Sequence, residues 1–289
     1  MVSGTPETPL PLLPTPPVYT TWRDQAIATY HAGSGRSVLL VHSINAAASV
    51  FEMREPFQRL SAHFAVHAID LLGYGNSARP PWRYRAAMYV DLIEALLEQI
   101  GQPTALIASS LGAAYAVIAA TRRPHLVDRL VLICPTGIGQ LDRPPGIAAY
   151  TTYQILRSPF GRLLYRLLTT RPSIRLFLAS QAYADPASIT DGRLDVFYQT
   201  CRRPGAYYAP ICFLSGLLNC DISTAFASLT QPTLLVWGSD ARTSPLSLAS
   251  HFVRVRVATK VAVIDRASLL VQDEQPEAFI EKVMPFLNH

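Results

Sequence analysis

Charged residues are scarce in this chain, and lysine is almost absent. Only 16% of the 289 residues are Asp, Glu, Lys or Arg, and lysine occurs only at Lys260 and Lys282. The formal net charge of +5 is therefore carried by arginines that are scattered along the chain. Proteins that bind nucleic acids concentrate basic residues on one surface, often with aromatic residues between them. The sequence shows no such concentration, and we do not expect a nucleic-acid partner.

Long apolar runs, a secretory signal and metal-binding cysteine pairs are also missing. No run approaches the roughly 18 apolar residues that a membrane-spanning helix needs. The first residues lack the basic and continuous apolar segments of a secretory signal, so we expect a cytoplasmic protein with no transmembrane segment. None of the cysteines has Cys-x-x-Cys spacing, and we expect reduced thiols, no bound metal and no cofactor. The cysteines are Cys134, Cys201, Cys212 and Cys220.

What the chain has instead is a hydrophobic content of 49%, which is enough for a well-buried core. Prolines crowd the first seventeen residues and predict an extended, mobile leader over residues 1–30. Short apolar runs then alternate with helical patterns, which predicts an α/β fold with a mostly parallel sheet flanked by helices. The expected strands, each buried on both faces, are 37–43, 64–70, 104–110, 129–135, 232–238 and 260–265, and the expected helices include 84–100, 111–123 and one from Pro276.

The alternation stops between Pro135 and Gln231, where the sequence contains several helical segments rich in Tyr, Leu and Arg. An insertion of that size between two strands predicts a helical cap over the carboxyl edge of the sheet, where ligands bind in open α/β sheets. We therefore expect an α/β core made of residues 31–137 and 230–289, with a cap formed by residues 138–229.

The stretch ALIASSLGAAYAV, residues 105–117, places two serines where an expected strand meets an expected helix. A sharp turn at such a junction forces its central residue into a strained conformation and requires small residues two positions before and after it. Ser110 has Ala108 and Gly112 at these positions, whereas Ser109 has bulky residues there. The sequence therefore predicts that Ser110 is the central residue of the turn and the candidate nucleophile.

Segments in a fixed order resemble the α/β-hydrolase superfamily over nearly all of residues 30–289. They are VLLVHSINAAASVFEM, AIDLLGYGNSARP, the stretch around Ser110, PTLLVWGSDARTSP and DEQPEAFIEKVMPFL. HSINAAAS also resembles a subgroup of bacterial and plastid-type hydrolase-like proteins. The resemblance implies an α/β-hydrolase fold with an inserted cap. It also implies a serine nucleophile that a histidine deprotonates and an acid orients, in the chain order Ser, acid, His.

The resemblance further implies two backbone N–H groups that stabilise a developing oxyanion. They belong to Leu111, directly after the candidate nucleophile, and to Ile44, in the loop after His42. The family has Gly after this histidine, whereas this chain has Ser43. The chain thus departs from the family pattern within the oxyanion loop.

The acid and histidine positions of the triad are both substituted. Counted from the Trp-Gly pair at the end of the expected strand 232–238, the family's acid position is Ala241, and the nearest carboxylate is Asp240, one residue earlier. Aligned on the final helix, the family's histidine position holds Leu269. His42 lies at the edge of the expected pocket and is the remaining candidate base, although the family's residue there is usually structural.

Different functions remain open at this point. The first is binding or hydrolysis of a small apolar ester-like substrate through Ser110. The second is another enzyme class, a lyase, isomerase or cyclase, and the third is a non-catalytic ligand-binding protein. Loss of the base from a serine triad typically lowers the rate on the order of 10⁴-fold. The substituted positions therefore weigh against ordinary hydrolysis by a Ser-His-Asp triad and keep the other two functions open. Tyrosines in the expected cap favour a small apolar molecule as the partner in each case.

Arginines recur among Leu, Ile and Phe residues in the expected cap. This pattern resembles a basic amphipathic surface that lies against an anionic membrane. A cap helix with a solvated arginine face and an apolar face over the pocket is the stronger interpretation, because Pro159 and Pro172 interrupt any long helix. Peripheral membrane contact through the cap is the weaker one. The arginines are Arg157, Arg162, Arg166, Arg171 and Arg175.

Overall fold

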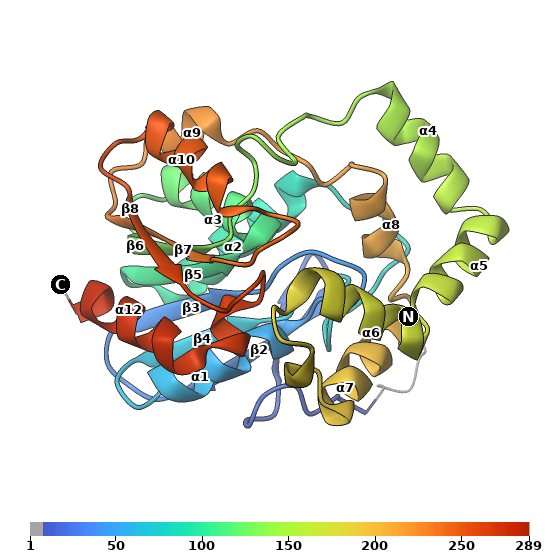
Figure 1. Ribbon diagram of the computed structural model, residues 1–289, viewed down its shortest axis with the longest axis horizontal. Coiled ribbons are helices and arrows are strands. Elements are labelled where there is room, and N and C mark those ends of the chain that lie inside the picture. The colour runs from blue at the N-terminus through green and yellow to red at the C-terminus, as the bar shows by residue number, and fades with distance from the viewer. Residues whose placement is uncertain (1–7, 289) are drawn as a thin grey trace.

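The computed structural model describes residues 8–288, whose strands form one central sheet (Figure 1). The strands are β1 Val18–Trp22, β2 Gln25–Ala32, β3 Ser37–Val41, β4 Ala65–Ile69, β5 Thr104–Ser109, β6 Val127–Ile133, β7 Thr233–Gly238 and β8 Lys260–Ile264. Their order across the sheet is β1-β2-β4-β3-β5-β6-β7-β8. β2 pairs antiparallel with β1 and β4, and all the other neighbours are parallel. The predicted α/β class with a mostly parallel sheet is confirmed.

Helices cover both faces of the sheet. The α-helices are α1 Arg54–Leu60, α2 Ala86–Ile100, α3 Ser110–Arg122, α4 Ile147–Leu156, α5 Pro159–Leu168, α6 Arg171–Phe177, α7 Asp191–Arg202, α8 Tyr208–Leu214, α9 Ser223–Ala227, α10 Ala249–Val255, α11 Val271–Glu274 and α12 Pro276–Asn288. In Figure 1, α1 and α12 lie on one face, and α2, α3, α9 and α10 lie on the other. Short 3-10 or π turns occur at Val50–Met53, Leu178–Ala182, Pro186–Ser188 and Leu246–Leu248.

The apolar runs predict the strands of the parallel part, because five of the six expected segments contain one of the strands β3 to β8, and the remaining segment, 129–135, overlaps β6, which starts earlier at Val127. The helix expected at 84–100 is α2, and it ends at Gly101, whose φ of 71° is left-handed. The last expected strand differs in burial, because β8 forms the edge of the sheet and pairs only with β7. Its residues Val261 and Val263 are 40% and 39% exposed.

The first part of the chain differs from the expected leader. Residues 18–32, which overlap the predicted leader 1–30, form the hairpin of β1 and β2. Arg23 and Asp24 connect the two strands with φ values of 48° and 59°. Two consecutive positive φ angles are typical of a type I′ turn, which matches the twist of a hairpin. The antiparallel edge of the sheet is thus made by residues that the proline content assigns to the leader.

Contacts upstream of the hairpin also fix the chain. Leu12 and Leu13 are buried, and the backbone of Leu10 exchanges two hydrogen bonds of 2.8 and 2.9 Å with the Asn76 side chain. Residues 10–13 are therefore packed against the core, although prolines surround them. The part of the predicted leader formed by residues 1–7 lies outside the described residues.

The chain between β6 and β7 forms α4 to α9, all of which fall within the predicted cap segment 138–229. Helices α4 to α8 lie beyond one edge of the sheet (Figure 1). α9 instead packs against α3 and α10, and so it belongs to the layer that covers the sheet. Within the described part of the chain, no helix has the length and apolar character required to cross a bilayer.

Candidate active site

An apolar cavity of about 130 Å³ lies where the carboxyl ends of the central strands meet the inserted helices. The strand ends contribute Ser43, Ile44, Ser109, Ser110, Cys134, Thr136, Thr243, Ser244, Leu269 and Leu270 to its lining. The inserted segment contributes Gln140, Leu141, Phe177, Leu178, Ala182, Phe197 and Phe213, and the segment after β3 adds Asn45 and Glu52. The structure therefore brings the candidate nucleophile to the wall of a mostly apolar cavity.

Ser110 occupies the sharp turn that the sequence predicts. It follows β5 directly, starts α3, and has a φ of 53°, which is rare for a residue with a side chain. Gly112 is required by the close approach of the preceding loop, because a Cβ at this position would lie 2.3 Å from the carbonyl oxygen of His42. Ala108 is fully buried. The elbow geometry expected for a nucleophile is thus present at Ser110.

The expected oxyanion residues lie in the first turn of α3 and in the loop after β3. Leu111 is in the first turn of α3, where backbone N–H groups have no acceptor within the helix. Ile44 lines the cavity. The N–H of the preceding residue, Ser43, is already used, because it donates a 3.1 Å hydrogen bond to Glu52 Oε2. The arrangement keeps Ile44 and Leu111 as the candidate donors.

His42 is not positioned to act as the base. Its side chain is fully buried, its Nδ1 lies 2.6 Å from the carbonyl oxygen of Ser43, and its Nε2 accepts a 3.0 Å hydrogen bond from the N–H of Leu71. Burial lowers the pKa of His42 to about 4, so the ring is neutral at pH 7. With Nε2 occupied as an acceptor, the ring connects two loops and cannot take a proton from Ser110.

Asp240 does not replace the acid of the triad. It is exposed, lies outside the cavity lining, and accepts a 3.2 Å hydrogen bond from the neighbouring Ser239 hydroxyl. The family position itself, Ala241, is buried and carries no polar group. Asp240, one residue before Ala241, therefore presents its carboxylate to solvent.

Leu269 does line the cavity, which agrees with its alignment to the histidine position. No histidine is present in the cavity lining formed by the described residues. The side chain at the predicted base position is therefore apolar and faces the same space as Ser110.

Glu52 is the functional candidate that the sequence analysis missed. Its carboxylate is fully buried at the cavity wall and accepts hydrogen bonds from the Ser43 hydroxyl at 3.0 Å and from Asn45 Nδ2 at 3.1 Å. Burial raises its pKa to about 7, although hydrogen bonds from Ser43 and Asn45 oppose that rise. The sequence contained a signal for this burial. Glu52 lies within the apolar run SVFEM, and an acid in such a run is buried when the neighbouring side chains are buried.

Cys134 is the other ionisable group of the lining. It follows β6 with a φ of 40°, and burial raises the pKa of its thiol to about 12. A thiol with this pKa stays protonated at neutral pH and is a poor nucleophile. Among the described residues, no cluster of His, Cys, Asp or Glu is suited to hold a metal ion. Glu52 is thus the cavity group able to exchange a proton near pH 7.

Comparison with known proteins finds relatives that are named as hydrolases or esterases and that match most of this chain. It is 28% identical over 261 residues to 2-(acetamidomethylene)succinate hydrolase of Mesorhizobium japonicum, covering 89% of each chain. It is 24% identical to pimeloyl-[acyl-carrier protein] methyl ester esterase of Aliivibrio fischeri, over 89% of this chain and 95% of the other.

A serine hydrolase involved in carbazole degradation has a similar solved structure. Its TM-score is 0.78 at 19% identity, with 94% of this chain and 98% of the other covered. At this identity the likeness concerns the fold alone. The model of the Alpha/beta hydrolase family matches residues 38–282, which includes both the strands around Ser110 and the inserted helices. The chain is therefore a member of the α/β-hydrolase family.

Proposed function

We propose that this protein binds a small apolar molecule with an ester or similar bond beside Ser110 and hydrolyses that bond. The observation that carries the proposal is the position of Ser110, on a strained turn facing an apolar cavity with a titratable acid, Glu52, in its wall. Membership of a family whose relatives include a hydrolase and an esterase supports the reaction type.

Glu52 takes the role of proton acceptor in this proposal. The Ser110 hydroxyl oxygen attacks the carbonyl carbon, and its proton passes to the Glu52 carboxylate through a water molecule or a substrate atom, since no hydrogen bond within the described residues joins the two side chains. The N–H groups of Ile44 and Leu111 stabilise the oxyanion. The same proton then goes to the leaving alcohol, and a water molecule cleaves the acyl-serine to release the acid and restore the hydroxyl.

The lining favours an uncharged substrate. The described residues of the lining include no Arg, Lys or His side chain, so a carboxylate or phosphate would lose its hydration without gaining an ionic partner there. Phe177, Phe213 and Leu269 contribute apolar surface next to Ser110. We infer a substrate with a small apolar acyl or alkyl part and no charge near the reacting bond.

One observation favours a second candidate function. An acid with a pKa of about 7 beside oxyanion donors is suited to remove a proton next to a carbonyl group, without attack by serine. In a lyase, isomerase or cyclase of this kind, Glu52 is the base, and Ser110 only donates a hydrogen bond to the substrate oxygen.

Labelling with a fluorophosphonate probe, followed by mass spectrometry, tests the role of Ser110. We expect a stoichiometric adduct on Ser110 and slow hydrolysis of nitrophenyl butyrate, both lost in Ser110→Ala and kept in the matched Ser109→Ala variant. Glu52→Gln should lower the rate at pH 8 by about 10²-fold or more, which is the typical contribution of a general base.

The outcomes separate the two functions. An adduct that forms equally well in Glu52→Gln means that another group activates Ser110. No adduct and no ester hydrolysis in the folded protein would exclude the hydrolase. Glu52-dependent turnover of an apolar ketone that Ser110→Ala retains would then assign the protein to the second class.

A further inference from the structure

Large apolar side chains point into solvent on α5 and α6. Phe160, Leu163, Leu167, Leu168 and Leu176 are between 50% and 70% exposed. Single exposed apolar residues are common, but a cluster of this kind marks a surface that contacts something apolar. We call these five residues and the neighbouring arginines Arg162 and Arg166 the α5–α6 face.

The orientation of α5 is opposite to that of an ordinary cap helix. The sequence analysis favoured an apolar side over the pocket and arginines in solvent. The buried side of α5 is instead made by Gly161 and Tyr165, and the Tyr165 hydroxyl lies 3.1 Å from the carbonyl oxygen of Ala206. The leucines that the sequence assigns to the interior therefore lie on the outside.

Basic and apolar residues form two adjacent strips on this helix. Leu163 and Leu167 are four residues apart, as are Arg162 and Arg166, so each pair lies on one side of the helix. Phe160 extends the apolar strip at a spacing of three. Helices that lie in a bilayer interface have this arrangement, with apolar residues facing the acyl region and arginines at the level of the phosphates.

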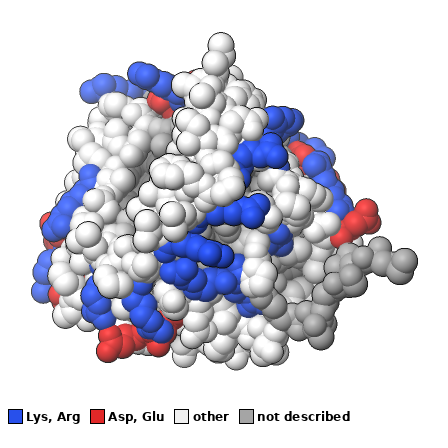
Figure 2. Space-filling view, turned by 90° about the vertical axis from the view of Figure 1, so that its right-hand side faces the viewer, with Lys and Arg blue, Asp and Glu red and all other residues white. Residues whose placement is uncertain are grey.

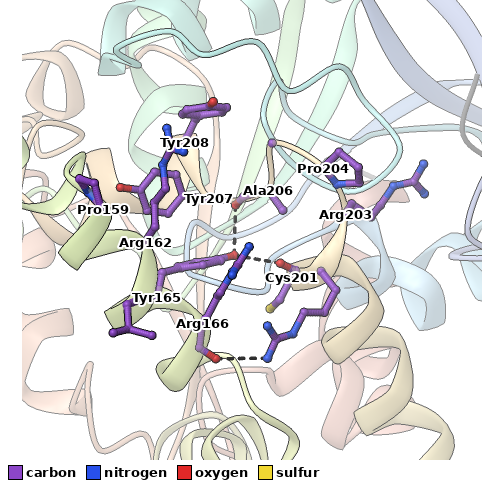
Figure 3. Close-up of a pocket in the computed structure, with 13 residues that line it drawn as sticks. Pro159, Arg162, Tyr165, Arg166, Cys201, Arg203, Pro204, Ala206, Tyr207 and Tyr208 are labelled. Carbon is purple, nitrogen blue, oxygen red and sulfur yellow. Dashed lines mark hydrogen bonds between the residues drawn. The ribbon is translucent and has the colours of Figure 1, made fainter. Parts of the chain in front are cut away.

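The arginines of the strip have no acidic partner within the described part of the chain. The neighbouring Arg171 and Arg175 pair with Asp195 and Asp191, whereas no ion pair involves Arg162 or Arg166. Figure 3 shows both side chains at a surface cavity of about 520 Å³. In Figure 2, arginines gather near the middle of this side of the molecule, with the visible acidic side chains towards its edge.

A second apolar cavity is lined by residues of this surface and by residues of the candidate active site. It has a volume of about 400 Å³ and is lined by Leu168 and Leu176 of the α5–α6 face. It shares Asn45, Phe177 and Phe213 with the cavity that contains Ser110. The second cavity thus adjoins both the exposed face and the candidate active site.

We propose that the α5–α6 face docks on an anionic phospholipid bilayer, and that the second cavity admits apolar molecules from it. The apolar strip enters the interface, and Arg162 and Arg166 bind lipid phosphates. An acidic protein would pair with the arginines but would not account for the exposed leucines. A second copy of this chain would place the same arginines of the two copies against each other, where their charges repel. Docking does not depend on catalysis by Ser110; the route to the active site rests on the proposed function.

Vesicle sedimentation tests the docking. We expect the protein to bind vesicles that contain 30% phosphatidylglycerol in phosphatidylcholine, to bind pure phosphatidylcholine weakly, and to be released by salt. Arg162→Ala with Arg166→Ala should weaken binding by about 30-fold, because each basic residue near the surface contributes roughly fivefold. Leu163→Ser with Leu167→Ser should also abolish it. Two matched controls should bind like the unaltered protein. They are Arg254→Ala in α10 and Val257→Ser, at an exposed residue after α10.

Several results would overturn the proposal. Equal binding to both vesicle types, no binding to either, or unchanged binding by the arginine variant excludes an anionic bilayer. Binding of soluble polyglutamate without binding of vesicles assigns the face to an acidic protein. A dimer in light scattering that Leu163→Ser with Leu167→Ser converts to a monomer assigns it to a second copy. Loss of the fluorophosphonate adduct without loss of vesicle binding contradicts only the proposed hydrolysis.

Discussion

Burial of an ionisable acid at the cavity wall costs free energy, and hydrogen bonds to the Glu52 carboxylate reduce that cost. Among the described residues the carboxylate has no cationic partner in direct contact, yet its oxygens accept hydrogen bonds from Ser43 and Asn45. These bonds favour the charged form, but burial outweighs them and raises the pKa to about 7. Glu52 thus keeps a proton in the folded protein at pH values where it loses that proton in the unfolded chain.

The stability of the fold should therefore depend on pH through Glu52. A folded pKa of about 7 against a usual value of 4.5 means that this carboxyl group favours folding below pH 4.5, and that the advantage is lost as the pH rises through 7. Glu52→Gln removes this loss. We expect the stability of the variant relative to the parent to rise by about 1 to 3 kcal/mol between pH 4.5 and pH 8, measured by urea unfolding. A difference that is constant with pH would contradict the raised pKa.

Gly112 offers a second test at the same scale. A Cβ at this position would meet the carbonyl oxygen of His42 at 2.3 Å, and neither backbone can move without displacing the elbow. Gly112→Ala should therefore destabilise the fold by about 2 to 4 kcal/mol. The matched variant is Gly192→Ala in α7, where a Cβ meets nothing within 4 Å and should be neutral or slightly stabilising. Thermal unfolding measures both, and equal effects would refute the steric argument.

At the level of elements, the loops after β7 and β8 hold Ala241 and Leu269, which align with the family's acid and histidine positions. The two loops are packed together, because the N–H of Asp240 donates to the carbonyl oxygen of Ala267 at 3.0 Å. Gly238 makes this contact possible, since a Cβ there would lie 2.2 Å from the same oxygen. Ala241 and Leu269 are thus held on neighbouring loops, as an acid and a histidine of a triad would be.

Restoring both side chains should create a faster esterase. Ala241→Asp with Leu269→His supplies a base that faces the Ser110 cavity and an acid to orient it. We expect the rate of nitrophenyl butyrate hydrolysis to rise by at least about 10²-fold, toward the loss that removal of a triad base causes. Leu269→His alone should give a smaller gain, and adding Ser110→Ala should abolish it. A double variant that folds but gains no activity would show that these positions do not form a triad.

The limits of sequence analysis also follow from particular elements. The strands of the parallel part were predictable because their apolar runs are buried on both faces. The position of Ser110 was predictable because a sharp turn allows only small residues two positions before and after it. The hairpin of β1 and β2 was not predictable from the sequence. Its turn consists of Arg23 and Asp24, whereas Asn-Gly or Asp-Gly is the usual signal for such a turn. The direction in which α5 faces depends on the helices beside it, and no spacing within α5 specifies that direction.

At the scale of the whole molecule, the inserted helices are attached to the core by a buried charge cluster. Asp273 of α11 pairs with Arg54 at the start of α1 and lies 3.8 Å from Arg193 of α7. The Tyr183 hydroxyl donates a hydrogen bond to the same carboxylate. Beside this cluster, Glu274 accepts hydrogen bonds from the N–H groups of residues 184 and 185 at 2.7 and 2.8 Å. The wall of the candidate site is therefore joined to the sheet layer through α11.

Arg54→Met should show how strongly this attachment depends on charge. Burial raises the pKa of Asp273, and the guanidinium groups of Arg54 and Arg193 oppose that rise. Without Arg54 the buried carboxylate keeps the Tyr183 hydrogen bond and the more distant charge of Arg193, so we expect a loss of about 3 kcal/mol at pH 8. The loss should shrink as the pH falls and Asp273 takes up a proton, because a raised folded pKa favours the folded state at low pH.

Arg171→Met removes an exposed ion pair with Asp195 and should change the free energy of unfolding by less than about 1 kcal/mol at either pH. Equal losses in the two variants would mean that the cluster contributes no more to folding than a surface pair.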